Sequence, residues 1–155
     1  PGKVDSGIYV NKLSDPATKV CCQTALIGAY QASTPSTKMR SWTGTTVEAP
    51  AVIKNGGYYY LYFSGNIYAN ASYGTGVARS TSITGPYTEA PDSPQINCSR
   101  MVSTFGGTCS NGPGGASISP NGAFAYHGAM STETTRWVYS ASLGIKSTTG
   151  WLYPY

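Results

Sequence analysis

Apolar and aromatic positions occur in short runs that glycine, proline and polar residues interrupt, and the clearest pair of runs lies near the middle of the chain. Residues 49–54 form one apolar run and residues 58–64 form another, with Asn55 and Gly56 between them. Because an Asn-Gly pair readily adopts the positive backbone angles of a tight turn, the pattern predicts an antiparallel β-hairpin that turns at Asn55-Gly56.

The second strand of this hairpin carries large apolar side chains on both faces. Side chains alternate along a strand, so one face has Tyr58, Tyr60 and Tyr62 and the other has Tyr59, Leu61 and Phe63. A strand that is aromatic on both faces loses apolar contact area if either face meets water. We therefore expect both faces to be covered.

Further short runs predict strands at residues 8–10, 26–30, 76–80, 117–119, 123–129 and 136–143. Turn signals separate them every 8 to 15 residues, with no helical period, and residues 99–108 read as a glycine-rich loop. The pattern is typical of an all-β protein in which strand, hairpin, aromatic strand and corner repeat like the blades of a propeller. At ~40–45 residues per four-stranded blade, the chain makes about three blades, fewer than the four that closure requires.

Composition supports this fold class and narrows the choice of partner. The chain has 155 residues, of which 40% are hydrophobic, 10% are charged and 13 are tyrosines. Such polar-tipped aromatic side chains suit contact with a neutral polyol. The net charge is +4, but the basic residues are scattered, which argues against nucleic acid as a partner. No apolar run is long enough to span a membrane, so we expect no membrane partner.

Cysteine usage favours an oxidising, extracellular setting, and a secreted protein is expected. Cys98 and Cys109 bracket the predicted loop and form the natural disulfide of the chain, although spacing alone does not prove it. Cys21 and Cys22 are adjacent, and a bond between them would be strained, so pairing elsewhere or a free state is favoured for both.

Two glycosylation sequons point to the same setting. Asn70 and Asn97 each begin an Asn-X-Ser tripeptide, and both tripeptides lie in stretches that read as loops. We expect both asparagines to be glycosylation sites of a secreted glycoprotein.

Glu48 is the carboxylate whose position best suits a catalytic role. It precedes Ala49 and Pro50. Because a residue before proline is biased toward extended backbone, we expect Ala49 to be extended and Glu48 to lie where the first strand of the hairpin begins. An acid at the end of a sheet that is covered on both faces is partly desolvated, which suits a proton donor. The alternative is a solvated residue that happens to precede a strand.

Several strings in this region resemble glycoside hydrolase family 43. They are V-E-A-P at residues 47–50, G-Y-Y-Y-L at 57–61, Y-G-T-G-V-A at 73–78 and T-G-P-Y at 84–87. Further on, G-P-G-G, Y-H-G and the run from Arg136 follow in the order expected of that family's last blades. The resemblance covers roughly residues 44 to 145, and it implies part of a five-bladed β-propeller.

The resemblance implies a secreted arabinanase, arabinofuranosidase or xylosidase acting on arabinose- or xylose-containing plant polysaccharide by inversion. Glu48 matches the family's general acid. The family's general base and its acid-tuning Asp would lie upstream of Pro1, so the chain looks like the C-terminal half of a larger catalytic domain. Completion by a missing N-terminal half or a second chain is expected. The alternative is a non-catalytic carbohydrate-binding or interaction module that keeps the strands and has lost the base.

The resemblance also implies places near the substrate for His127 and Arg136, and Tyr68 and Tyr73 could offer aromatic faces to a sugar. The alternatives carry similar weight: a hydrogen-bonded core histidine, a surface cation–aromatic contact, and aromatic packing between blades. No cofactor is expected. Calcium occurs in the family, but Gly115 stands where many relatives have a histidine, so a metal site is doubtful here.

Overall fold

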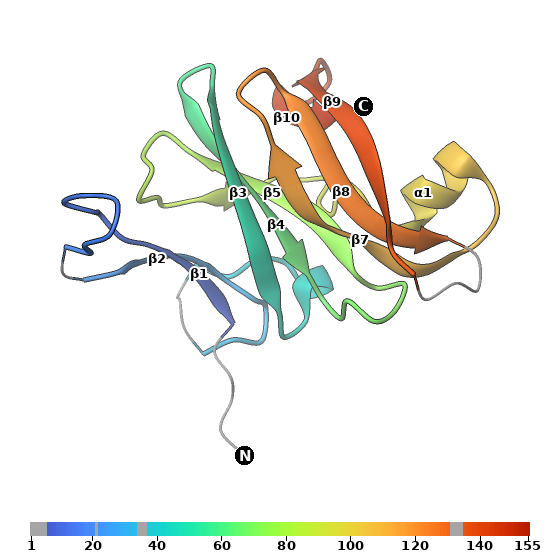
Figure 1. Cartoon of the computed structure of the whole chain (residues 1–155), viewed down its shortest axis with the longest axis horizontal. Helices are drawn as coiled ribbons and strands as arrows, with labels where there is room; N and C mark the ends of the chain where they lie inside the picture. The colour runs from blue at the N-terminus through green and yellow to red at the C-terminus, as the bar shows by residue number, and fades with distance from the viewer. Residues whose placement is uncertain (1–5, 21, 34–36, 131–134) are drawn as a thin grey trace.

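A computed structural model describes residues 6–20, 22–33, 37–130 and 135–155 (Figure 1). The predicted all-β class is confirmed, because strands dominate the described residues. The elements are β1 (Gly7–Val10), β2 (Thr24–Gly28), η1 (Ser41–Thr43), β3 (Val47–Asn55), β4 (Tyr58–Gly65), β5 (Gly74–Ser80), β6 (Thr88–Glu89), α1 (Cys98–Phe105), β7 (Cys109–Ile118), β8 (Ala123–Met130), β9 (Trp137–Lys146) and β10 (Trp151–Pro154).

The strands form three antiparallel sheets that lie side by side. One sheet has the order β3-β4-β5-β6, a second has the order β7-β8-β9-β10, and β1 pairs with β2 in a two-stranded sheet. In Figure 1 the β3–β6 sheet lies between the blue β1–β2 pair and the orange-red β7–β10 sheet. Strands that are consecutive in the chain are neighbours in each sheet, as in propeller blades. The molecule is a partial β-propeller, with two four-stranded blades and part of a third.

Strand β4 is buried on both faces, as its sequence predicts. Leu61 and Phe63 belong to a core shared with β1 and β2, and Tyr60 and Tyr62 belong to a second core shared with the last blade. Tyr62 packs edge to face against Phe124 with ring centroids 5.2 Å apart, and its hydroxyl donates to the Leu152 carbonyl at 3.0 Å. Each core therefore fills the space between two blades.

The predicted hairpin is present, but its turn lies one residue later than expected. Strands β3 and β4 pair from Val47–Gly65 to Asn55–Tyr58, so Asn55 is the last residue of a strand. The turn residues are Gly56 and Gly57, with φ of 53° and 84°. Both glycines adopt positive φ without steric cost, and the alternating aromatic side chains of β4 set the register.

The expectation of an extended Ala49 is wrong. Ala49 has a φ of 49°, in the left-handed region. The pairing shifts between Glu48 and Ala51, so Ala49 and Pro50 form an irregularity in the ladder. Pro50 has no amide hydrogen for the ladder, and a bulge accommodates it. The backbone beside Glu48 is therefore strained by roughly 1–2 kcal/mol.

The predicted loop at residues 99–108 is also wrong, because most of it is helix α1. The Asn97 side chain accepts a hydrogen bond from the Arg100 amide at 2.9 Å and caps the N-terminus. Met101 faces the core, and Gly106, with a φ of 75°, ends the helix. A capping asparagine, one buried side chain and a terminal glycine are enough to form two turns against the sheet.

The remaining strands agree with the sequence except at their ends. Strand β2 begins two residues before its predicted start, β7 is much longer than the predicted residues 117–119, and β6 and β10 were not predicted. The predicted Cys98–Cys109 disulfide is confirmed. Cys22 is disulfide-bonded, so its predicted alternative of a free state is wrong, while Cys21 lies outside the described residues.

Neither helix in the described part of the chain is long and apolar enough to cross a lipid bilayer.

The disulfide should stabilise α1 and the start of β7. Its two cysteines are 11 residues apart, and closing a loop of that size stabilises by about 3 kcal/mol in the chain-entropy model. We expect the double variant Cys98→Ser/Cys109→Ser to lose about that free energy of unfolding in urea denaturation. Peptide mapping without reduction should recover the linked pair. A free thiol at either position, or unchanged stability, would contradict the assignment.

Candidate functional site

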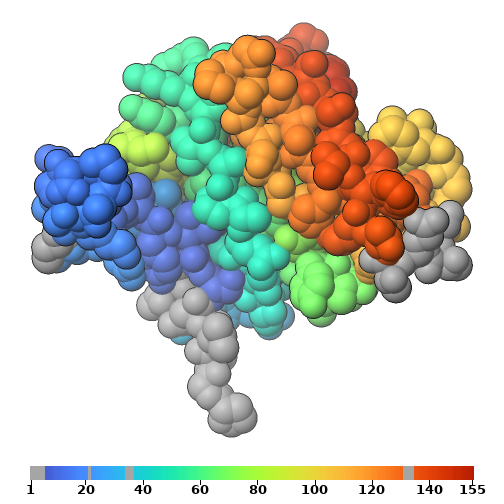
Figure 2. Space-filling view, in the orientation of Figure 1, coloured from blue at the N-terminus to red at the C-terminus, as the bar shows by residue number. Residues whose placement is uncertain are grey.

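Glu48 lies at the end of β3 where β3, β4 and β5 come together. It pairs with Ser64 on β4, and Ser64 pairs with Thr75 on β5, so one cross-strand row carries all three residues. The expected partial burial of Glu48 is wrong, because the residue is exposed. Figure 2 shows β3 at the molecular surface between the blue N-terminal residues and the orange-red C-terminal strands. Glu48 is therefore open to a ligand from solvent.

Tyr73 fixes one oxygen of this carboxylate. Its hydroxyl donates a hydrogen bond to Glu48 Oε1 at 2.6 Å. Tyr73 precedes β5 and is only 2% exposed. Burial, followed by the hydrogen bond to Glu48, raises the pKa of Tyr73 to about 12. The hydroxyl therefore stays protonated and remains a donor to Glu48 at any physiological pH.

Arg136 lies over the other side of Tyr73 and joins several chain segments. Its guanidinium carbon is 5.3 Å from the Tyr73 ring centroid. It donates to the Gly112 carbonyl at 2.7 Å and to the Tyr68 carbonyl at 3.3 Å. Its positive charge also interacts with the carboxylate of Glu48. A fixed positive charge therefore lies near Glu48.

His127 completes the group from the middle of β8. Its Nδ1 accepts a hydrogen bond from Arg136 Nε at 2.8 Å, which requires the neutral imidazole. Burial, and then the positive charge of Arg136, lower the pKa of His127. The ring is therefore neutral at pH 7 and holds the guanidinium in place.

The structure thus brings four of the five sequence-predicted catalytic and substrate-binding residues together: Glu48, Tyr73, His127 and Arg136. Tyr68 joins the group only through its carbonyl, because its side chain is 66% exposed. These contacts also bear on the alternatives given above for Arg136 and His127, a cation–aromatic contact and a hydrogen-bonded histidine. Arg136 does make a cation–aromatic contact, but with a buried ring beside Glu48, and His127 is a hydrogen-bonded residue within the same cluster.

Three glycines of β7, Gly112, Gly114 and Gly115, make room for this cluster, a role that the sequence analysis did not predict. A Cβ on Gly114 would lie 1.9 Å from Cε1 of Tyr73, and one on Gly112 would lie 1.8 Å from the Tyr73 carbonyl oxygen. A Cβ on Gly115 would lie 2.3 Å from His127 Nε2. The concentration of glycine at residues 112–115 was the signal available in the sequence. These glycines let β7 approach Tyr73 and His127 closely.

The other described carboxylates have partners elsewhere. Asp15 accepts backbone hydrogen bonds from its own turn, and Asp92 pairs with Lys146 at 2.7 Å. Glu89 accepts from Trp42 Nε1 at 2.6 Å and from the Arg40 amide at 2.7 Å. Burial raises the pKa of Glu89. Asp5 and Glu133 lie outside the described residues.

Trp42 is a packing residue that joins η1 to the β3–β6 sheet. Its ring stacks on Phe63 with centroids 5.7 Å apart, and the bond to Glu89 ties η1 to β6. A Cβ on Gly76 would lie 2.6 Å from the Trp42 ring, so this glycine makes room for the indole.

The residues around His127 do not suit calcium. Calcium prefers several oxygen ligands, whereas His127 is held by a guanidinium and Glu48 is bonded to Tyr73. Gly115 has a φ of 64°, and a side chain there would collide with His127. Among the residues with described positions, no three His, Cys, Asp or Glu side chains group as metal ligands.

The two predicted glycosylation asparagines differ in their surroundings. Asn70 is exposed, and its Oδ1 accepts from the Ser72 amide at 2.8 Å. Asn97 is half-buried as the cap of α1. In both residues the carbonyl oxygen is engaged, whereas glycosylation uses the amide nitrogen. Modification of either residue stays a prediction.

Comparisons with known proteins agree on one family. Residues 1–139 match the model of glycosyl hydrolases family 43. The crystal structure of a thermostable family-43 glycoside hydrolase aligns with a TM-score of 0.75 and 26% identity over 97% of this chain and 47% of that chain. No curated protein matches the chain.

Two further structures show the same fold at lower identity. The xylan beta-1,4-xylosidase from Bacillus halodurans C-125 gives a TM-score of 0.70 and 19% identity, covering 96% of this chain and 27% of that one. The family-43 endo-arabinanase from Bacillus licheniformis gives 0.63 and 21%, covering 95% and 48%. The chain thus spans about half of the first and third structures and about a quarter of the second.

The close approach of Gly114 to Tyr73 predicts the effect of one added methyl group. Gly114→Ala should displace the Tyr73 ring, break its bond to Glu48 and destabilise the protein by about 1–3 kcal/mol. Chemical shifts of the Tyr73 ring protons and urea denaturation measure both effects. Gly144→Ala is the matched control, because its Cβ would meet only the exposed ring of Tyr155. An unmoved Tyr73 in the Gly114 variant would contradict this arrangement.

The environment of His127 predicts how it titrates. We expect an NMR titration to give a pKa below 6.5, and Arg136→Gln to raise it by removing the neighbouring charge. Because the folded pKa is lowered, the unfolded chain binds more protons just below pH 6.5. The contribution of neutral His127 to the stability of the folded protein is therefore complete above pH 6.5, and it is lost as the pH falls through the folded pKa. A His127 pKa above 6.5 would contradict the bond from Arg136 Nε.

Proposed function

The chain belongs to glycosyl hydrolases family 43, and we propose from that membership that the protein hydrolyses glycosidic bonds in arabinose- or xylose-containing polysaccharides. The likeness to a xylosidase and an endo-arabinanase supports this substrate class. The chain covers less than half of the 26%-identical family-43 structure, so the activity is proposed for the complete protein.

Glu48 is the proposed general acid, and the 2.6 Å hydrogen bond from Tyr73 to Oε1 is the observation that carries the proposal. Because Tyr73 occupies Oε1 as a donor, the acidic proton of a neutral Glu48 sits on Oε2. That proton can pass to the glycosidic oxygen of a bound sugar as the bond to the anomeric carbon breaks. Arg136 then stabilises the carboxylate that remains.

We further propose that the reaction inverts the anomeric centre. An inverting enzyme needs a second carboxylate ~6.5–9.5 Å from the acid, with room between them for the attacking water. Asp15, Glu89 and Asp92 are engaged elsewhere, so none of these described acids is our candidate. The base and an acid-tuning Asp are proposed to come from a segment outside the printed sequence or from a second chain.

Secretion is the proposed setting. The Cys98–Cys109 disulfide supports it, because such bonds persist in oxidising compartments. The sequons at Asn70 and Asn97 fit the same setting.

The alternative is a carbohydrate-binding module without catalysis. One observation favours it: none of the described acids lies with Glu48 as a second candidate carboxylate. In that case Glu48, Tyr73 and Arg136 would bind sugar hydroxyls, and the protein would bind a polysaccharide without cleaving it.

Glu48→Gln in the complete protein tests the proposed acid. Glutamine keeps the shape and removes the proton, so turnover of arabinan or xylan should fall by roughly 10²–10⁴. An activated aryl glycoside should lose much less, because its leaving group needs little protonation. Steady-state kinetics on both substrates, with NMR detection of the product anomer, measure the effect.

Glu89→Gln is the matched control, since it makes the same carboxyl-to-amide change at a residue bonded to Trp42. Unchanged turnover on polysaccharide in the Glu48 variant, or a larger loss in the Glu89 variant, would overturn the assignment of the acid. Binding without any hydrolysis by the unaltered complete protein would establish the module instead.

A further inference from the structure

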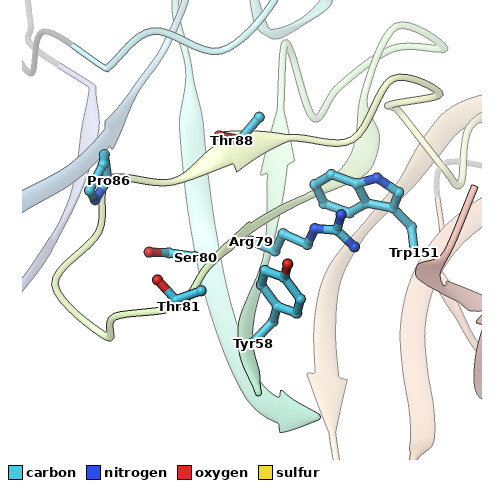
Figure 3. Close-up of a pocket in the computed structure, with 7 residues that line it drawn as sticks. All are labelled: Tyr58, Arg79, Ser80, Thr81, Pro86, Thr88 and Trp151. Atoms are coloured by element: carbon cyan, nitrogen blue, oxygen red, sulfur yellow. The ribbon is translucent and has the colours of Figure 1, made fainter. Parts of the chain in front are cut away.

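A pocket lies at the far end of β4 and β5 from Glu48. Its volume is about 330 Å³, at the small end of the range for ligand sites. The register places it: Tyr59 pairs with Ser80 at this end, whereas Gly65 pairs with Gly74 at the end near Glu48. The lining residues are Tyr58, Arg79, Ser80, Thr81, Pro86, Thr88 and Trp151 (Figure 3).

Arg79 is held between two aromatic rings in this pocket. Its guanidinium carbon lies 4.5 Å from the Tyr58 ring centroid and 4.1 Å from that of Trp151. One nitrogen, Nη1, donates to the Gly150 carbonyl at 3.0 Å. Figure 3 shows the guanidinium between the two rings, while Ser80 and Thr81 lie on the side of the pocket from which the Arg79 side chain extends. The rings and the carbonyl fix the plane of the cation.

Most of the hydrogen-bonding capacity of Arg79 remains unused. A guanidinium has five N–H donors, and in the described part of the chain Arg79 makes the one bond to Gly150. The only ion pair among those residues is between Lys146 and Asp92, so no described carboxylate neutralises Arg79.

Arg100 shows how a purely structural arginine differs. It also lies over an aromatic ring, with its guanidinium carbon 4.4 Å from the Tyr153 centroid. It donates to two backbone carbonyls, those of Gln95 and Pro154, and so joins α1 to β10. Arg79 has the same stacking but keeps a donor edge beside a pocket.

The rest of the pocket lining is suited to a sugar ring. Thr81 and Thr88 are exposed and contribute hydroxyl groups, and Pro86 adds an apolar surface between them. Hydroxyls recognise sugar hydroxyls, and the apolar surface of Pro86 can cover an apolar part of the sugar ring. A planar, pre-oriented guanidinium is the group that binds a carboxylate through two parallel hydrogen bonds.

We propose that this pocket binds a carboxylate-bearing sugar, such as a uronic acid residue of a polysaccharide. The carboxylate would pair with the free edge of Arg79, and the ring would lie against Thr81, Pro86 and Thr88. This site is separate from Glu48, and it would hold an acidic part of a glycan away from the site of cleavage.

Methyl β-D-glucuronide is the probe, and methyl β-D-xyloside and acetate are the controls for the neutral sugar and the bare carboxylate. We expect the glucuronide to shift the Trp151 indole resonance saturably in NMR titrations of the full chain, and added NaCl to weaken binding. An acidic xylan oligosaccharide should also bind, and failure to bind it would overturn the assignment to a polysaccharide. Equal shifts with acetate or with the xyloside would overturn the proposal.

Arg79→Gln should weaken glucuronide binding by about tenfold or more, because the charge-assisted pair is lost. Lys54→Gln is the matched control: it removes one positive charge 5.2 Å from the Tyr59 ring, outside this pocket, and should change affinity less than about twofold. Unchanged affinity in the Arg79 variant would overturn the proposal.

Two further variants keep the test decisive. If Arg79→Gln does not fold, Thr88→Val removes an exposed hydroxyl without disturbing the rings, and unchanged affinity there would overturn the proposal. Glu48→Gln should leave glucuronide binding intact. Failure of the proposed hydrolysis and failure of this site are therefore distinguishable.

Discussion

The burial of β4 on both faces is the constraint on which the other features depend. Leu61 and Phe63 are buried in the core shared with β1 and β2. Tyr60 and Tyr62 are buried in the core shared with the last blade. Moving β4 by one residue would exchange the two sets and place each in the wrong space. The register of β4 in turn fixes β3 and β5, because both pair with it along its length. The positions of Glu48 and Tyr73 follow from that pairing.

The candidate site is a product of close packing at one end of this sheet. Ser64 is buried at the end of β4, and its hydroxyl accepts a hydrogen bond from the Gly115 amide at 2.9 Å. That bond draws β7 against β4, and the glycines of β7 leave the space that Tyr73 and His127 fill. The only charges in the cluster are those of Glu48 and Arg136. Neutral groups, the Tyr73 hydroxyl and the His127 imidazole, hold both of them.

The sequence predicted the features that depend on a regular period and missed those that depend on contacts between segments. The alternation in β4 predicted the hairpin and its two faces. Helix α1 has only eight residues, too few for a helical period to stand out, and glycines beside it favoured a loop. Gly57 was missed as a turn residue because Asn55-Gly56 and Gly56-Gly57 can both form a tight turn. The packing of β4 determines which of the two pairs forms it. The family resemblance indicated Glu48 and His127, but the space that Gly114 leaves for Tyr73 depends on two strands distant in sequence.

The left-handed backbone at Ala49 has a consequence for how the molecule loses order on heating. This residue keeps its conformation only while Glu48 and Ala51 on either side of the bulge stay paired with β4, since an isolated chain would relax to an extended form. Opening of the bulge thus releases the backbone strain at Ala49, so this part of the central hairpin should open at a low cost in free energy. Local opening would begin at Ala49, between the buried Val47 and the paired Ala51. If Glu48 is the proposed general acid, heating the complete protein would then abolish its activity before the protein unfolds globally.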